Sequence, residues 1–263
     1  MEKMFAIFGN PVAHSKSPLM HNRFFKTFQI DGCYGRYLLE KGEELIGKFW
    51  ELGLEGANVT VPFKEVATQQ VDRLEGLGKE VGAINTLVRE GKWVIGYNTD
   101  GPGFLEAVKG FQFQQALILG GGGTARAVAV ALARNGAEVV VLNRSKGRLQ
   151  FFRDKGIPCY SWEEFKLKRE YQLVVNTTSA GLIDNSLPAP EGLLEEILEG
   201  ARYGVDAIYG KVTPFLKLAR RKGLETQDGR EMLVYQGVLA MELFLDQFLP
   251  REEVAQLYRE VLG

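Results

Sequence analysis

The sequence predicts an α/β fold built from two domains, and three observations lead to this. Short apolar runs alternate with stretches of helical periodicity along most of the chain. A glycine cluster at residues 120–123 stands between one such run and a helical stretch. About one hundred residues of alternating strands and helices precede that unit, enough for a separate domain. We place the junction between the domains near residues 98–113.

The segment from residue 115 to residue 148 is the clearest unit of this pattern. Residues 116–119 form an uncharged apolar run that predicts a buried strand, and residues 139–142 form a second one. The helical stretch between them ends at Asn135-Gly136. Glycines at the turn leave backbone N–H groups and the positive end of the helix open to a pyrophosphate. The unit therefore predicts a dinucleotide site, whose G-x-G-G residues are Gly120, Gly122 and Gly123.

The residues after the second strand indicate which dinucleotide is bound. An NAD site usually has Asp or Glu there, which accepts from the ribose 2′-hydroxyl. This chain has Asn143, Arg144 and Ser145, followed by Arg148, so no carboxylate repels a 2′-phosphate. Arg144 can stack on adenine or fork onto phosphate, and Ser145 can donate a hydrogen bond. We predict NADP(H) rather than NAD, with a solvated basic turn as the alternative.

Composition excludes several classes of function. The chain has 263 residues, 45% of them apolar, and a formal net charge of -1, which predicts neither a nucleic-acid nor an anionic-membrane partner. No apolar run approaches the roughly 18 residues of a membrane span, and the N-terminus does not resemble a signal peptide. Cys33 and Cys159 are expected as reduced thiols, which favours the cytoplasm. His14 and His21 lack neighbouring ligand residues, so we predict no metal site.

Two serines precede the first helical stretch, LMHNRFFKTF. Ser15 and Ser17 stand beside Pro18, which suits a first helical turn. Ser17 alone can be the N-cap of that helix. Equally, two serines at i and i+2 can hold a small anion or a polyol, and the sequence leaves both interpretations open.

Polar residues then gather around a predicted strand end at residues 57–64. Asn58 and Thr60 lie in that strand, and Lys64 is expected to start the next helix. A lysine is electrostatically unfavourable at a helix N-terminus unless it meets a substrate or a carboxylate. We therefore predict a site around Lys64.

Two further polar residues lie in the next segment. Residues 81–88 and 93–95 are predicted to form a hairpin, and Asn85 lies inside its first strand, where it needs hydrogen-bond partners. Asp100 precedes a helix predicted at about residues 104–109. It is either the N-cap of that helix or the partner of Lys64, and spacing alone does not separate the two.

In the second half, polar residues again follow predicted strands, where doubly wound sheets bind ligands. Predicted strands cover residues 157–160, 173–176, 203–206 and 225–227, and Thr177 follows the second of them. Gly229 precedes a long apolar helix at residues 232–248, which contains Gln236. A last helix is predicted at about residues 251–262.

Nine motifs in this order resemble the bacterial monofunctional shikimate dehydrogenases along nearly the whole chain. They are GNPVAHSKSPLMHN, GANVTVPFKE, GAINTLV, GYNTDGPGF, ILGGGGTARA, NRS, NTTSAG, DAIYGKVTPFL and DGREMLVYQG. The resemblance implies reversible reduction of 3-dehydroshikimate to shikimate with NADPH, a step toward chorismate and the aromatic amino acids. It also implies an α/β substrate domain at residues 1–100 and a Rossmann-type NADP-binding domain at residues 101–236, with a cleft between them. The C-terminal helices at about residues 237–263 would pack on the substrate domain, in a monomer or homodimer.

The same resemblance implies roles for individual residues. The catalytic pair would be Lys64 and Asp100. Substrate would be held by Ser15, Ser17, Asn58, Thr60, Asn85, Tyr209 and Gln236. The cofactor would be held by Gly120, Gly121, Gly122, Gly123, Thr124, Asn143, Arg144, Ser145, Arg148, Thr177, Gly229 and Met232.

The chain departs from the family pattern at a few positions. The family's usual glycine loop G-A-G-G-A has Gly121 and Thr124 in place of its two alanines. The usual N-R-T ends in Ser145, which keeps the hydroxyl, and the usual D-L-I-Y has Ala207 in its second position. None of these changes removes a catalytic residue.

Two alternatives compete with this interpretation. A quinate/shikimate dehydrogenase has the same chemistry with broader use of substrate or of NAD and NADP. A non-catalytic nucleotide-binding protein can share the fold, because fold does not determine function. The presence of both Lys64 and Asp100 argues against the second alternative.

Overall fold

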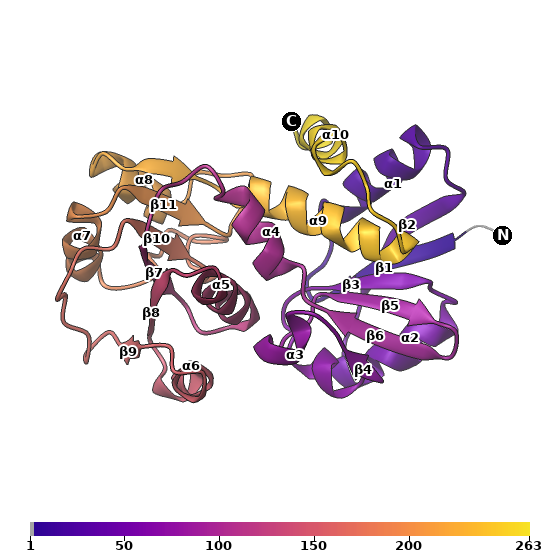
Figure 1. Ribbon diagram of the computed structural model, residues 1–263, viewed down its shortest axis with the longest axis horizontal. Helices are drawn as coiled ribbons and strands as arrows, with labels where there is room; N and C mark the ends of the chain where they lie inside the picture. The colour runs from indigo at the N-terminus through magenta and orange to yellow at the C-terminus, as the bar shows by residue number, and fades with distance from the viewer. Residues whose placement is uncertain (1–2) are drawn as a thin grey trace. The chain divides into compact units, whose positions relative to one another are not determined.

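The computed structural model describes residues 3–263 (Figure 1). The chain forms two compact units, one made of the residues up to Gly103 together with Val234–Gly263, and the other of Phe104–Leu233. The boundaries fall within helix α4 (Asp100–Ala107) and helix α9 (Arg230–Leu245). Each unit contains a six-stranded sheet with helices. The predicted α/β fold class is thereby confirmed.

The sheet of the first unit is mixed. Its strand order is β2-β1-β3-β5-β6-β4, in which β1 is parallel to β2 and β3, and β5 is antiparallel to β3 and β6. Strand β4 is parallel to β6. The strands are β1 (Lys3–Gly9), β2 (Gly32–Leu38), β3 (Gly56–Val59), β4 (Arg73–Leu74), β5 (Thr86–Glu90) and β6 (Trp93–Tyr97).

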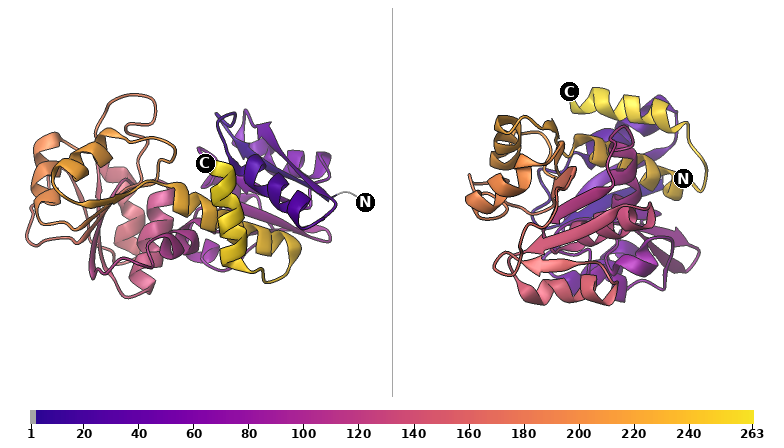
Figure 2. Two further views of the ribbon diagram at one scale, coloured as in Figure 1. Left: turned by 90° about the horizontal axis from the view of Figure 1, so that it is seen from above. Right: turned by 60° about the vertical axis from the view of Figure 1, so that its left-hand side comes forward.

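Helices cover both faces of this sheet, which explains the continuous apolar run in β1. Phe8 packs in the cluster that contains Leu45 and Phe49 of α2, whereas Phe5 contacts Phe25 of α1 and Phe244 of α9. The last helix lies beside α1 (Figure 2). The helices are α1 (Ser17–Thr27), η1 (Gly42–Glu44), α2 (Leu45–Glu51), η2 (Val66–Gln69), α3 (Gly78–Val81) and α10 (Arg251–Leu262).

The sheet of the second unit is parallel throughout, in the order β12-β11-β10-β7-β8-β9. The order reverses between β7 and β10, and doubly wound sheets bind their ligands at such a point. The strands are β7 (Gln115–Leu119), β8 (Glu138–Asn143), β9 (Cys159–Ser161), β10 (Leu173–Asn176), β11 (Tyr203–Asp206) and β12 (Glu225–Gln227).

Helices also cover both faces of the second sheet (Figure 1). Leu117 and Leu119 of β7 pack with side chains of α7 and α8, while α5 lies on the opposite side. This two-sided burial accounts for the uncharged run in β7. The helices are α5 (Gly123–Arg134), η3 (Lys146–Leu149), α6 (Gln150–Asp154), α7 (Glu191–Glu199) and α8 (Pro214–Arg221).

Several predicted elements have other bounds in the structure, and two of these differences bear on the site. The strand expected at residues 81–88 begins only at Thr86, because α3 occupies Gly78–Val81 and Gly82 follows it with a φ of 61°. Lys64 does not start a helix: it lies in a turn before η2. Its carbonyl accepts from Ile84 N at 2.9 Å, a tertiary bond that replaces the intrahelical one. The helix-dipole argument for Lys64 was therefore wrong.

Three further observations concern membrane spans, metal sites and cysteines. No helix within residues 3–263 is long and apolar enough to cross a membrane. The same residues contain no group of three or more His, Cys, Asp or Glu side chains that would hold a metal ion. Neither Cys33 nor Cys159 is in a disulfide among the described residues.

His21 is buried between α1 and α10. Its Nδ1 lies 3.0 Å from Tyr258 Oη, and its ring lies 4.5 Å from that of Tyr34. Burial lowers the pKa of His21 from 6.5 to about 3, against a smaller opposing effect of Asn58. The imidazole is therefore neutral in the folded protein at neutral pH.

This depressed pKa predicts an acid-sensitive contribution to stability. As pH falls below 6.5 the unfolded chain protonates first, so the contribution is complete above pH 6.5 and is lost toward the folded pKa of about 3. By about pH 5 the loss is about 2 kcal/mol. Replacing His21 by Asn keeps a polar group toward Tyr258. Between about pH 8 and pH 5, the free energy of unfolding measured in urea should then fall by about 2 kcal/mol less than in the wild type.

The matched control is His14→Asn, because His14 is the other histidine of the chain and is exposed. It should keep the pH dependence of the wild type. Equal slopes for the His21 variant and the wild type would contradict the prediction.

Candidate functional site

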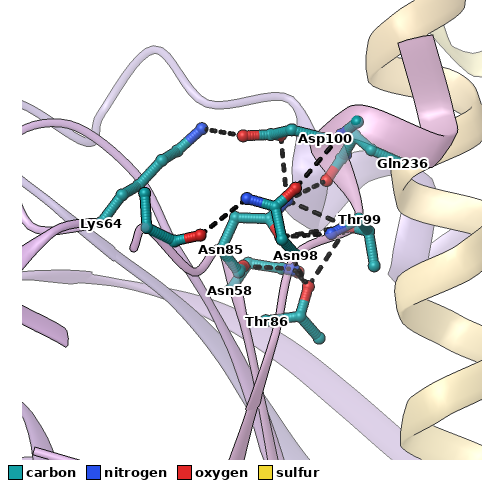
Figure 3. A network of polar contacts seen from close by, with 10 residues as sticks. Asn58, Lys64, Asn85, Thr86, Asn98, Thr99, Asp100 and Gln236 are labelled. Atoms are coloured by element: carbon teal, nitrogen blue, oxygen red, sulfur yellow. Dashed lines mark hydrogen bonds and ion pairs between the residues drawn. The ribbon is translucent and has the colours of Figure 1, made fainter. Parts of the chain in front are cut away.

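An ion pair between Lys64 and Asp100 is the centre of the first unit's polar cluster. Lys64 Nζ donates to Asp100 Oδ2 at 2.5 Å, and the two side chains point toward each other in Figure 3. Their side chains are 14% and 6% exposed. Asp100 is the first residue of α4, so the structure resolves the open question: its carboxylate is the partner of Lys64.

Asn85 holds the other oxygen of Asp100. Its Nδ2 donates to Asp100 Oδ1 at 2.9 Å and lies 3.4 Å from Gln236 Oε1 of α9. Its Oδ1 accepts from Thr99 N at 2.7 Å. Since Asn85 uses both ends of its amide, its orientation is determined, and it connects three segments distant in sequence (Figure 3).

Asn58 is fixed in a similar way. Its Nδ2 donates to Asn85 O at 3.0 Å and to Thr86 Oγ1 at 3.1 Å, while its Oδ1 accepts from Tyr34 Oη at 2.6 Å. Both amide protons are thus used within the protein. What Asn58 retains for a ligand is a lone pair on Oδ1, so it can accept a hydrogen bond from a hydroxyl but not donate one.

The two serines are buried at the start of α1. Ser17 is the first residue of this helix, and its N–H donates to Ser15 Oγ at 3.3 Å. The cap position is Lys16, which makes no side-chain capping bond. The N-cap interpretation of Ser17 was therefore wrong. Arg36 of β2 donates to Ser15 O from Nη2 at 2.6 Å and from Nε at 3.1 Å, which fixes the turn that carries both serines.

Thr60 lies just beyond β3. Its N–H donates to Phe8 O at 2.9 Å, and its carbonyl accepts from Phe63 N at 3.0 Å. Together with the residues above, it completes the part of the predicted site that lies in the first unit. An ammonium, a carboxylate, three hydroxyls and several oriented amides suit a polyhydroxylated anionic ligand near a proton donor.

The glycine turn of the second unit lies between β7 and α5. Gly120 has a φ of 126°, and a Cβ there would lie 2.5 Å from Thr177 Oγ1. A Cβ on Gly121 would lie 3.0 Å from both Arg148 Cβ and Asn143 Cγ. The glycine that replaces the usual alanine at position 121 thus accommodates these two side chains. Gly122 is the N-cap position of α5, and Gly123 and Thr124 are its first residues.

The basic residues after β8 differ in their partners. Lys146 Nζ donates to Glu164 Oε1 at 2.7 Å, whereas exposed Arg144 makes no hydrogen bond or ion pair within residues 3–263. Asn143 Nδ2 donates to Ser145 O at 2.9 Å. Arg144 is therefore available to a phosphate.

The remaining predicted residues lie at the ends of other strands of the second unit. Thr177 follows β10, and its N and Oγ1 both donate to Leu119 O, at 2.9 and 2.8 Å. Tyr209 follows β11 and is half-buried, while Gly229 donates its N–H to Ile208 O at 3.0 Å. Met232 is buried in α9.

The predicted residues fall into two groups, one in each unit. The first unit contains Ser15, Ser17, Asn58, Thr60, Lys64, Asn85, Asp100 and Gln236, and the second contains the cofactor residues and Tyr209. Sequence reasoning missed Tyr34, Arg36 and Thr99. Their hydrogen-bond partners lie elsewhere in the sequence and come close only in the folded chain. No local sequence pattern therefore indicated these three residues.

Comparisons with known proteins found a family model, relatives and solved structures that the chain matches. A family model of the shikimate dehydrogenase substrate binding domain matches residues 7–87. The Helicobacter hepaticus protein named shikimate dehydrogenase (NADP(+)) is 45% identical over 98% of both chains. Thermus thermophilus shikimate 5-dehydrogenase (AroE), solved in complex with NADP(H) and shikimate, is 36% identical with a TM-score of 0.87, over 98% of this chain and 99% of that one. The shikimate dehydrogenase structure from Aquifex aeolicus is 34% identical with a TM-score of 0.83, over 98% and 97%.

Proposed function

Because the chain belongs to the shikimate dehydrogenase family, we propose that it catalyses the reversible NADPH-dependent reduction of 3-dehydroshikimate to shikimate. It is thus an NADP-dependent oxidoreductase of the route to chorismate and the aromatic amino acids. The observation that carries the proposal is the Lys64–Asp100 ion pair, 2.5 Å long and largely shielded from solvent. A protein that only binds a nucleotide has no use for such a pair beside a set of oriented hydroxyl and amide groups.

Reduction of a ketone needs a hydride and a proton. NADPH supplies the hydride when it is bound. Lys64 Nζ donates the proton to the developing alkoxide and stabilises its negative charge. Asp100 holds Lys64 with one oxygen and Asn85 with the other, so the carboxylate orients both groups.

The substrate contacts follow from the hydrogen bonds that each residue has left. Ser15 and Ser17 bind the carboxylate, because serine hydroxyls donate and the turn that carries them is fixed by Arg36. Asn58 accepts from a ring hydroxyl through Oδ1. The set that recognises the hydroxyls and the carboxylate of the substrate is completed by Thr60, Asn85, Gln236 and Tyr209.

The second unit binds NADP(H), which makes it the cofactor domain, and the first unit is the substrate domain. The pyrophosphate is held at Gly120–Gly123 and Thr124, at the start of α5. Asn143, Arg144, Ser145 and Arg148 hold the adenosine 2′-phosphate, and Thr177, Gly229 and Met232 lie toward the nicotinamide.

The experiment that tests this function measures the absorbance of reduced cofactor with purified protein, shikimate and NADP, and repeats it with NAD and with quinate. Reduction that requires shikimate and NADP supports the proposal. Comparable rates with quinate or NAD would assign the broader quinate/shikimate activity, which the names of the relatives do not favour. No reduction by a folded protein that binds NADPH would refute the enzymatic function.

Arg144 provides a sharper test of the cofactor. Replacing Arg144 by Ala should lower kcat/KM for NADP roughly 10- to 100-fold, the effect of losing a charge-assisted hydrogen bond to phosphate. The value for NAD, which lacks the phosphate, should stay nearly constant. The measurement is the ratio of kcat/KM for the two cofactors.

The matched control is Lys146→Ala, because Lys146 is a neighbouring cation already paired with Glu164. Its NADP preference should equal that of the wild type. A preference that survives Arg144→Ala would mean that other residues hold the 2′-phosphate.

We further propose that the chain acts in the cytoplasm as a monomer or homodimer, without a nucleic-acid or membrane partner. The formal net charge of -1 and two cysteines that form no disulfide among the described residues support this assignment.

A further inference from the structure

Asp206, the last residue of β11, is a fully buried carboxylate with no cationic partner among the bonds it makes. It is 0% exposed. It accepts three hydrogen bonds, from Thr213 Oγ1 at 2.6 Å, from Ile208 N at 2.9 Å and from Asn176 Nδ2 at 3.0 Å. Because all three partners donate, the carboxyl group acts purely as an acceptor. Burying a carboxylate is costly, so its presence at this position requires a reason.

On one side, Asp206 controls the loop after β10. The amide of Asn176 that donates to Asp206 is oriented by that bond, which leaves its Oδ1 to accept from Thr178 N at 3.0 Å and from Thr178 Oγ1 at 2.8 Å. Thr178 Oγ1 in turn accepts from Ala180 N at 3.1 Å. A chain of hydrogen bonds through Asn176, Thr178 and Ala180 therefore starts from the carboxylate, while Thr177 between them donates to Leu119 O.

On the other side, Asp206 controls the loop after β11. It holds Ile208 N directly, and it holds Thr213, which accepts from Leu216 N at 3.2 Å and so caps α8. Ile208 O accepts from Gly229 N at 3.0 Å. A Cβ at Gly229 would lie 2.2 Å from Ala207 O, so the segment before α9 follows this loop closely.

These loops carry residues that the proposed function places at the cofactor and the substrate. Thr177 lies inside the first loop and abuts Gly120, and Tyr209 lies inside the second. Gly229 contacts the second loop through its hydrogen bond to Ile208 O. One buried carboxylate therefore connects the segments that follow three adjacent strands of the parallel sheet.

We propose that Asp206 is a positioning residue: by accepting from Asn176, Ile208 and Thr213 it orders the loop that presents Thr177 to the cofactor and the loop that presents Tyr209 to the substrate. The proposal rests on the proposed function for the identity of the ligand. Asp206 itself does not touch the reacting atoms. It acts through the loops, as outer groups orient the ligands of a metal.

The test exchanges the side chains of the donor, Asn176, and the acceptor, Asp206, in the hydrogen bond that joins them. Asp206→Asn places an amide against the Asn176 amide, and Asn176→Asp places a carboxylate against the Asp206 carboxylate. Each single variant leaves mismatched groups. In the double variant Asn176→Asp/Asp206→Asn, the new Asn donates to the new Asp, and only the Thr213 hydroxyl loses its acceptor. Net charge and composition equal those of the wild type.

Two quantities are measured in all variants: the Kd of NADPH from its fluorescence, and hydrogen exchange of the peptides that cover residues 176–181 and 206–213. Each single variant should raise the Kd roughly tenfold or more and speed exchange in both loops, since a buried donor or acceptor is left unpaired. The double variant should recover to within about fivefold of the wild type. The control is Asp154→Asn, which changes an exposed carboxylate of α6 in the same unit that accepts from Gln150 Nε2, and it should match the wild type.

The outcomes separate this proposal from the proposed function. A single variant with a lower Tm but an unchanged Kd and unchanged loop exchange would show a purely structural Asp206 and overturn the proposal, while wild-type turnover of shikimate stands. A double variant no better than the worse single variant would also overturn it. If a single variant does not fold, a double variant that folds and binds NADPH supports the positioning role of Asp206, because the restored hydrogen bond restores the site. A wild type that binds no NADPH would refute the proposed function first.

Discussion

Replacing Lys64 by Ala is expected to lower kcat by roughly 10²- to 10⁴-fold, with a much smaller change in KM for shikimate. The amine is bonded to Asp100 at 2.5 Å and donates the proton in the proposed reaction. Loss of a general acid costs this much, and the same group also stabilises the alkoxide. An interaction made mainly in the transition state changes kcat more than KM. Steady-state kinetics with shikimate and NADP give both values.

Two further variants sharpen this prediction. Lys79→Ala removes an exposed lysine of the same unit that pairs with Glu75, and it should leave kcat unchanged. Lys64→Arg keeps a positive charge but replaces the amine by a guanidinium that does not release its proton. It should be nearly as inactive as Lys64→Ala. A raised KM with normal kcat in Lys64→Ala would make Lys64 a binding residue, and an active Lys64→Arg would reduce its role to charge alone.

The sequence was most informative where local pattern and fold coincide. The uncharged runs that became β7 and β8 are continuous because helices cover both faces of the parallel sheet. The turn between strand and helix required glycine at position 120, where a Cβ would meet Thr177. Strands β10 and β11 have the predicted bounds for the same reason, because all of their residues are buried. Strand β12 also has the predicted bounds, although its residues are exposed or half-buried.

Prediction failed where distant residues determine the backbone. Lys64 was expected at a helix start, but the pairing of its carbonyl with Ile84 holds it in a turn. Asn85 lies before its strand rather than inside it, because Gly82 ends α3 first.

Arg36 gave no signal at all, since what it fixes is a backbone carbonyl twenty-one positions away. The roles of the candidate residues came from the resemblance to the family, and Asn58, Thr60 and Thr177 were also noticeable as polar residues in or after predicted strands. What those side chains bond to was not identifiable from the sequence.

Replacing Asp100 by Asn should also lower kcat by roughly 10²-fold or more, although the side chain keeps its shape. Asp100 accepts from Lys64 with one oxygen and from Asn85 with the other. An amide has only one oxygen, so its NH₂ must face a donor on one side or the other. Asn85 cannot turn to compensate, because its own oxygen accepts from Thr99 N at 2.7 Å. Kinetics with shikimate and NADP measure the effect, and Asp72→Asn, whose carboxylate accepts from Val94 N away from the site, is the control.

The double variant Lys64→Ala/Asp100→Asn then decides whether the two groups act together. If Asp100 works by holding Lys64, the second substitution has little left to remove, so the double variant should be about as active as the worse single variant. If the effects multiply instead, Asp100 contributes independently of Lys64, for example by accepting a proton from a substrate hydroxyl. That result would contradict the role proposed for Asp100 and would make the carboxylate an acid–base group in its own right.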